Sequence, residues 1–151
     1  MAANIDPIYA RTPDIQVGGA ILGPTAVTLI DGTGATPIIF MADVTEGGYV
    51  EDIILKAVGT TAATVARVFL CTSTVASGSF VPGTTNTAVN TSLIREYSLT
   101  SVTASNTLAT NDAIIPIRRY IPAGMKLLIG FGTSTGAAGN GFAVTTFAGK
   151  L

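Results

Sequence analysis

The sequence contains no histidine and no tryptophan, and it has a single cysteine. Without histidine, the chain lacks the side chain that most often serves as a general base and as a transition-metal ligand. One cysteine excludes an internal disulfide framework and any zinc or iron–sulfur site built from several cysteines. These absences predict a protein that is not an enzyme and that has no catalytic residues, no cofactor and no metal site.

Charged residues are also scarce, at 11% of the 151 residues, against about 25% in a typical soluble domain. The formal net charge is -1, so the chain lacks the basic excess of a protein that binds nucleic acid, and we expect no such partner. Mean hydropathy is +0.55. So few charges on so apolar a chain predict that other subunits cover part of its surface, which makes it a homo-oligomer.

Long apolar runs are missing too. A membrane-spanning helix needs about 20 apolar residues in a row, whereas the apolar stretches here are short, such as Ala113–Ile117 and Leu127–Phe131. The segment Met1–Pro7 lacks the basic and apolar regions of a signal peptide. We therefore expect no membrane partner and synthesis in the cytoplasm.

Threonine is abundant, at about one residue in seven, and with valine it favours strands. Short apolar or alternating runs between Gly, Asn, Ser and Pro predict an all-β protein, an antiparallel β-sandwich of jelly-roll-like type. The strands predicted by this pattern are Ile15–Leu22, Ala26–Ile30, Thr36–Ala42, Tyr49–Val58, Ala63–Cys71, Leu93–Val102, Ala113–Ile121, Lys126–Thr133 and Gly141–Ala148.

The sequence divides into an extended N-terminal arm, residues 1–14, and a single β-sandwich domain, residues 15–151. Residues 1–52 hold seven acidic residues and one basic residue, and residues 53–151 hold two acidic and seven basic, so these parts carry formal charges of -6 and +5. This asymmetry suits contacts between copies. The residues expected at such an interface are, in the arm, Ile5, Pro7, Tyr9 and Arg11, and in a basic strip on a neighbour, Arg95, Arg118, Arg119 and Lys126.

Other candidate sites have simpler interpretations. The pair Asp43 and Glu46 is a weak match to a calcium loop and is more typical of a solvated turn. Cys71 ends a strand pattern and is expected to be a buried small hydrophobe. Arg118 and Arg119 are neighbours in a strand, so their guanidinium groups are expected on opposite faces, with a role at a strand edge or an interface.

Four segments, Phe40–Ile53, Gly59–Phe69, Ile121–Leu127 and Gly141–Gly149, together resemble small virion proteins of tailed bacteriophages, of the capsid decoration (cement) type. The run Ala-Thr-Val-Ala-Arg-Val-Phe, which ends at Phe69, is the most distinctive piece. The resemblance implies a β-sandwich on the outer surface of the capsid. It implies a homo-oligomer, expected to be a trimer, that binds the major capsid protein and stabilises the shell.

Two other functions fit the same residues. One is another virion component, such as a tail subunit or a head-fibre base subunit. The other is a carbohydrate-binding sandwich module, which the absence of tryptophan makes less favourable because sugar sites commonly use exposed aromatic side chains.

Overall fold

The computed structural model describes residues 12–22, 26–27, 30–33, 37–73, 84–110, 112–134 and 139–150. Eight strands account for most of these residues, and no helix occurs among them. In chain order the strands are β1 (Thr12–Leu22), β2 (Ile38–Met41), β3 (Gly48–Val58), β4 (Thr64–Cys71), β5 (Thr91–Leu99), β6 (Ala113–Ile121), β7 (Lys126–Phe131) and β8 (Gly141–Lys150).

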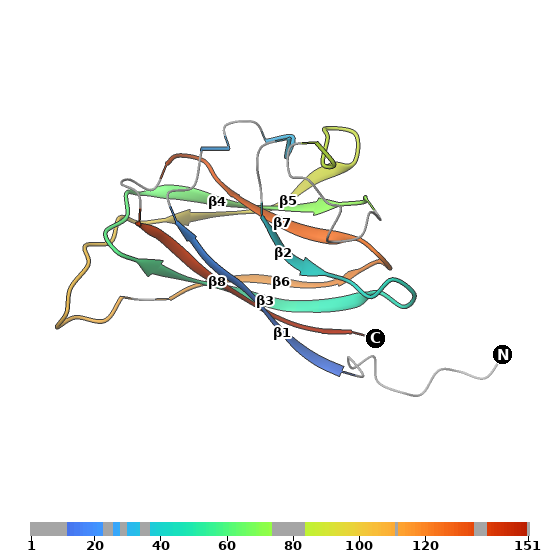
Figure 1. The fold of residues 1–151 in the computed structure, drawn as a ribbon, viewed down its shortest axis with the longest axis horizontal. Helices are drawn as coiled ribbons and strands as arrows, with labels where there is room; N and C mark the ends of the chain where they lie inside the picture. Colours follow the sequence, from blue (N-terminus) through green and yellow to red (C-terminus); the bar gives the residue numbers. More distant parts are fainter. Residues whose placement is uncertain are drawn as a thin grey trace.

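The strands form two four-stranded antiparallel sheets (Figure 1), here called sheet A, with the order β1-β8-β3-β6, and sheet B, with the order β2-β7-β4-β5. The pairs β1·β8, β2·β7, β3·β6 and β4·β5 are nested in the sequence, as if one long hairpin were rolled up. That order is the jelly-roll arrangement of an eight-stranded sandwich. The predicted all-β sandwich is therefore confirmed.

The N-terminal boundary differs from the prediction. Strand β1 begins at Thr12, with Pro13 opposite Gly149 of β8, so residues 12–14 belong to the sandwich and not to an arm. Proline is tolerated there because β1 is an edge strand, where one side of the backbone has no ladder partner. The predicted arm residues Ile5, Pro7, Tyr9 and Arg11 lie outside the described residues.

The predicted strand Ala26–Ile30 is not observed in the described part of that segment. Ala26 makes only an isolated bridge to Phe131, and Ile30 and Asp31 lie in a turn. Val27 instead packs on the outer face of sheet B, where its N–H donates a hydrogen bond to the Phe131 carbonyl at 2.7 Å, whereas Ile30 is exposed.

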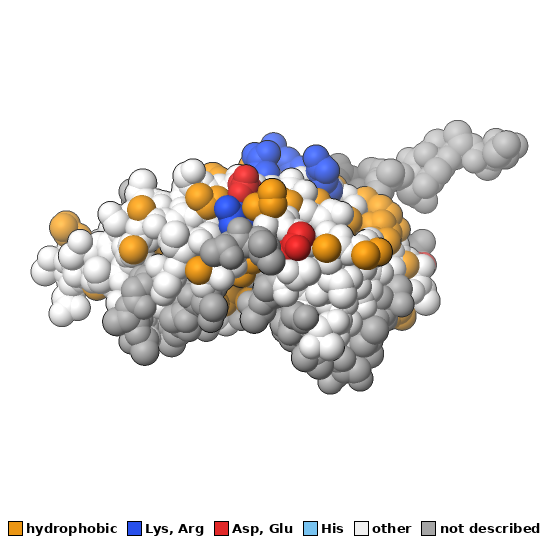
Figure 2. Space-filling model, turned by 90° about the horizontal axis from the view of Figure 1, so that it is seen from above, with side chains coloured by type: hydrophobic (Ala, Val, Ile, Leu, Met, Phe, Trp, Pro, Cys, Tyr) orange, Lys and Arg blue, Asp and Glu red, His pale blue; other side chains and the backbone are white. Residues whose placement is uncertain are grey.

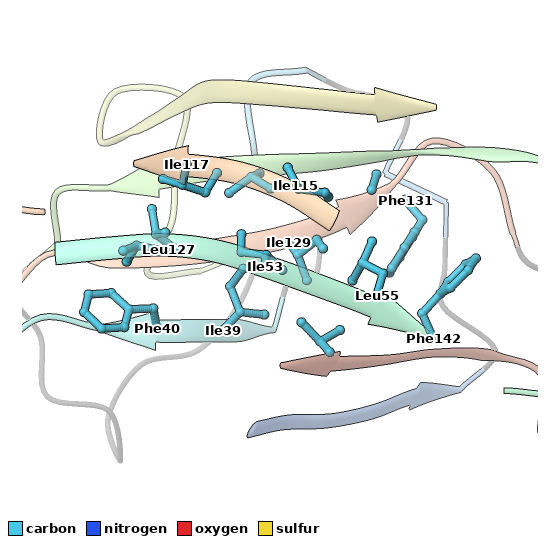
Figure 3. Close-up of a cluster of buried hydrophobic side chains, with 14 of the residues drawn as sticks. Ile39, Phe40, Ile53, Leu55, Ile115, Ile117, Leu127, Ile129, Phe131 and Phe142 are labelled. Atoms are coloured by element: carbon cyan, nitrogen blue, oxygen red, sulfur yellow. The ribbon is translucent and has the colours of Figure 1, made fainter. Parts of the chain in front are cut away.

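The main hydrophobic core fills the space between the two sheets (Figure 3). Inward-facing residues alternate along β3 and β6 and meet those of β4 and β7. Phe131 and Phe142 stack at one end with ring centroids 5.1 Å apart. The largest fully buried apolar side chains of this cluster are Phe40, Phe131, Ile39, Ile53, Leu55, Ile115, Ile121, Leu127 and Ile129.

A second, smaller core lies on the outer face of sheet B. It consists of Val27, Phe69, Cys71 and Leu128, with Ile38 and Leu93 packed against it. Phe69 and Leu128 are opposite each other in the β4–β7 register, on the side away from the main core. Part of the outer face of sheet B is therefore buried, whereas several described residues on the outer face of sheet A, such as Ile114 and Tyr120, are exposed.

Candidate interaction surface

The predicted basic strip is only partly present. Arg95 lies in β5, Arg118 and Arg119 lie in β6, and all three are exposed. Lys126, in β7, does not belong to it, because only 1% of this residue is exposed. Its Nζ donates hydrogen bonds to the carbonyls of Ser73 at 2.8 Å and Gly124 at 3.1 Å. The sequence prediction for Lys126 was wrong because its Nζ is held by the carbonyl of Ser73, which is distant in the sequence, as well as by that of Gly124 in the neighbouring turn.

Arg118 and Arg119 are separated by the geometry of β6. Arg118 has a φ of 49°, the one positive value among the described non-glycine residues. The register of β3 and β6 shifts at this point, so that two residues of β6 lie opposite Glu51. Arg118 pairs with Glu51 at 3.2 Å. This bulge re-aims side chains at the sheet edge, as bulges commonly do.

The side chain of Arg119 lies on the other face of sheet A from that of Arg118. It lies opposite Val50, which is fully buried in the main core, and Arg95 lies opposite the equally buried Val68 in sheet B. Directly opposed residues of antiparallel strands share a face. Both arginines therefore emerge from the inner side of their sheets, where the edge strands β5 and β6 part.

The two arginines line a small polar notch of about 40 Å³, here called the β5–β6 notch, whose lining is Ile94, Arg95, Pro116, Ile117 and Arg119. No acidic side chain belongs to this lining. Figure 2 shows Lys and Arg side chains gathered along one margin of the molecule. Arg118, in the bulge, pairs with Glu51 and does not belong to this lining, whereas Arg119 lies opposite the buried Val50 and lines the notch with Arg95.

The outer face of sheet A carries apolar side chains where an antiparallel sheet that faces water normally shows polar ones. Ile114, Tyr120 and Phe147 are 50%, 51% and 37% exposed. Their register partners across this face are Ile54 for Ile114, Tyr49 for Tyr120 and Asp52 for Phe147. The outer apolar patch is defined here as Tyr49, Ile54, Ile114, Pro116, Tyr120 and Phe147.

Sequence reasoning missed the outer apolar patch. Its signal is the run Ala113–Ile117, in which both faces of one strand are apolar. Such a run is typical of a strand that is buried on both sides, yet β6 is an edge strand with one covered face. The ion pairs Glu51–Arg118 and Lys56–Asp112, at 3.2 Å each, join β3 to β6 and to the residue directly before β6. An apolar centre with charges beside it is the composition of a protein interface.

A cleft of about 200 Å³ opens at the end of the sandwich where Phe142 lies. Its lining combines apolar residues of both sheets, including Leu55 and Leu99, with the half-exposed ring of Tyr97 and the carboxylate of Asp112. Asp112 pairs with Lys56 at 3.2 Å. The cleft is large enough for one side chain or one small ring.

The other candidate sites keep their simple interpretations. The carboxylate of Asp43 accepts hydrogen bonds from the Thr45 N–H, the Thr45 hydroxyl and the Glu46 N–H. It therefore stabilises the turn in which it lies. These hydrogen bonds, of which the one from the Thr45 hydroxyl has the largest effect, hold the pKa of Asp43 below its ordinary value. Cys71 is a buried free thiol, as predicted. Among the residues that the structure describes, no three His, Cys, Asp or Glu side chains group as metal ligands, and no helix has the length and apolarity to cross a membrane.

Comparisons with known proteins give no further guide. Neither the protein-family models, nor the curated proteins, nor the solved structures contain a match to this chain.

Proposed function

We propose that this chain is a structural virion protein of the capsid decoration (cement) type. It binds the major capsid protein on the outer surface of a phage capsid as a homo-oligomer, with a trimer as the expected state, and it stabilises the shell. The observation that carries the proposal is the outer apolar patch, because a free monomer gains nothing from exposing it. The resemblance in the sequence supplies the class of assembly.

The energetic basis of such a function is burial of surface. Apolar area that becomes buried contributes about 25 cal/mol per Å², and a shell presents many identical contacts that act together. A rigid sheet suits this role, because it loses little conformational freedom on binding. The low charge of the chain, 11%, fits a surface that neighbouring subunits cover.

The direct test places a lysine in the outer apolar patch. Ile114→Lys and Phe147→Lys are expected to fold, since both side chains are already exposed, and to lose self-association and binding to capsids by at least tenfold. Light scattering measures the first and co-sedimentation with undecorated shells measures the second. Val89→Lys is the matched control, because Val89 is 97% exposed and lies outside the patch.

The proposal fails if the wild-type protein has the monomer mass of 15.3 kDa at micromolar concentration and does not bind shells. If it instead assembles with tail tubes or fibre bases, a virion component of another kind replaces the decoration role. A virion reconstruction that locates the copies distinguishes these positions.

One observation favours a second candidate, a carbohydrate-binding module. The cleft beside Phe142 combines the ring of Tyr97 with the polar groups of Ser98, Thr100 and Asp112, and jelly rolls also occur as lectin domains. A glycan array tests this function. Selective binding that Tyr97→Ala abolishes would support it, and no binding would exclude it for the sugars on the array.

A further inference from the structure

Strand β5 differs from the other edge strands of the two described sheets. Edge strands commonly avoid pairing with foreign strands through prolines, bulges or short length. β1 contains Pro13 and an irregular register after Val17, and β2 has four residues. β6 contains Pro116 and the bulge at Arg118. In β5, residues 95–99 contain no proline and pair with β4 in unbroken register, so β5 presents a regular free edge.

The free side of this edge has no hydrogen-bond partner in the part of the chain that the structure describes. β5 pairs with β4 alone, and no other backbone hydrogen bond of the described residues reaches residues 92–99. Arg95, Glu96, Tyr97 and Ser98 are all exposed. An extended segment of another chain can therefore join sheet B as a further strand, held by main-chain hydrogen bonds.

The inner face of β5 leads to two different pockets. Arg95, Tyr97 and Leu99 share this face, since they are two positions apart and the register partners of the first two belong to the main core. Arg95 lines the β5–β6 notch with Arg119, whereas Tyr97 and Leu99 line the cleft beside Phe142. A strand added to β5 therefore has one inner side chain beside the notch and the next inner side chain beside the cleft.

The linings of the two pockets differ in chemistry. The notch has two arginines and no acidic side chain, and the ion pairs of the described residues involve Lys56, Arg67 and Arg118 instead. Guanidinium groups bind carboxylates through planar, two-point contacts. The cleft is lined mainly by apolar side chains and by the ring of Tyr97, against which another aromatic ring packs well. A carboxylate therefore suits the notch and an aromatic ring suits the cleft.

We propose that β5 accepts an extended segment of a partner protein, which adds antiparallel to sheet B with a carboxylate beside Arg95 and an aromatic ring beside Tyr97. The named strands of both sheets pair antiparallel, and this pairing is slightly more stable than the parallel kind. In an antiparallel strand the ring precedes the carboxylate by two positions, so the recognised pattern is aromatic-x-acidic. The site shares only Pro116 with the outer apolar patch. It is therefore a second contact surface, separate from that of the proposed function.

The probe for this site is the fluorescein-labelled peptide Ser-Thr-Phe-Thr-Asp-Thr-Ser, titrated with the full chain and followed by fluorescence anisotropy. Replacing Asp by Asn, or reversing the order to Asp-Thr-Phe, is expected to weaken binding at least fivefold. Arg119→Gln is expected to weaken binding of the original peptide by a similar factor. Arg118→Gln is the matched control and is expected to change binding less than twofold, because Arg118 pairs with Glu51 and does not line the notch.

Methylation of the peptide backbone distinguishes strand addition from contacts made by side chains alone. The N–H groups of neighbouring residues in a strand point to opposite sides, so only one of two neighbouring N–H groups faces β5. N-methylation is therefore expected to abolish binding at either the Phe or the Thr that follows it, and to be tolerated within about threefold at the other.

Four outcomes overturn the proposal. Absence of binding by the folded wild-type chain excludes the recognised pattern, and equal tolerance of both methyl positions excludes strand addition. Equal losses in Arg118→Gln and Arg119→Gln exclude the notch as the carboxylate site. Binding that occurs only when the chain is diluted to a monomer assigns β5 to a second copy. Lysine at Ile114 is expected to leave peptide binding unchanged, so the proposed function stands or fails separately.

Discussion

Asp52 of β3 lies directly opposite Phe147 of β8 on the outer face of sheet A, and one carboxylate oxygen of Asp52 is buried there without a hydrogen bond. Pro116 of β6 lies opposite Asp52 on the other side. An acidic side chain thus sits between two apolar neighbours within the outer apolar patch. Because this buried oxygen has no hydrogen-bond donor, it lowers the stability of the chain.

Asp52→Val is therefore expected to raise the free energy of unfolding by about 1 kcal/mol, because leaving a buried polar atom unpaired costs about 1–3 kcal/mol and valine suits a strand. Urea denaturation of the non-associated chain measures the change. Asp112→Val is the control, since it removes an exposed carboxylate that has an ion pair. A loss of stability in Asp52→Val would show that the carboxylate is satisfied in solution.

The buried amine of Lys126 predicts a pH dependence. Burial lowers the pKa of Lys126 below its ordinary value of 10.5. Between the folded and the unfolded pKa the unfolded chain binds more protons, so stability from this residue rises as the pH rises through that window. Denaturation of wild type and Lys126→Met at several alkaline pH values gives the difference. The prediction fails if the difference between the two is constant with pH.

Lys126→Met is also expected to destabilise the protein at pH 7, by about 1–3 kcal/mol, because the carbonyls of Ser73 and Gly124 lose their donor. Lys56→Met, at an exposed ion pair, is expected to change stability by about 0.5 kcal/mol or less. Equal effects of the two substitutions would contradict a structural role for Lys126.

The Asp43 turn predicts a dependence at acid pH. Its hydrogen bonds from Thr45 and Glu46 favour the charged carboxylate and lower its pKa from 3.8. The stability that this turn contributes is therefore present above pH 3.8 and is lost as the pH falls through the lowered pKa. Asp43→Ala is expected to remove that loss and to lower the urea midpoint at pH 7. If the stability of Asp43→Ala fell at acid pH as much as that of wild type, the role of the Asp43 carboxylate would be contradicted.

Alanine substitutions at two glycines distinguish the stability cost of backbone strain from that of a steric clash. Gly19 and Gly47 have φ values of 71° and 86°. A Cβ at Gly19 meets nothing within 4 Å, whereas at Gly47 it would lie 2.6 Å from the Tyr120 hydroxyl and 2.7 Å from the Ile121 carbonyl oxygen. Gly19→Ala is expected to cost about 1 kcal/mol from the left-handed backbone alone. Gly47→Ala is expected to cost clearly more, and equal thermal shifts would contradict the packing of Tyr120 on this turn.

Local chemistry explains which parts of the fold were predictable. The run from Ile121 to Gly124 predicts a type I turn with Pro122 at its second position, and the structure has a turn one residue later, closed by a hydrogen bond from the Met125 N–H to the Pro122 carbonyl at 3.1 Å. The Asn-Gly dipeptide at 140–141 is a hairpin signal, but no hairpin forms there, because β7 and β8 lie in different sheets and the dipeptide only precedes the start of β8. A local turn depends on residues within a few positions of each other and can be seen in the sequence, whereas the pairing of the strands that it joins cannot.

The interaction surface depends on distant pairings and was harder to predict. Arg95 and Arg119 line one notch because β5 and β6 are edge strands of two different sheets. No local pattern contains that information. Lys126 has the sequence of a surface cation and was misassigned, since its burial depends on the carbonyl of Ser73, which is 53 positions away.

The nested pairing of the strands also has a kinetic consequence. Strand β8 lies between β1 and β3, so the ladder partner of β1 is synthesised after all the other described strands. Contacts between such distant residues make a domain fold slowly. Until residues 141–150 leave the ribosome, β1 and one edge of β3 stay unpaired and open to strands of other nascent copies. Each new copy thus passes through a stage in which it can join another chain before its own sheet is complete.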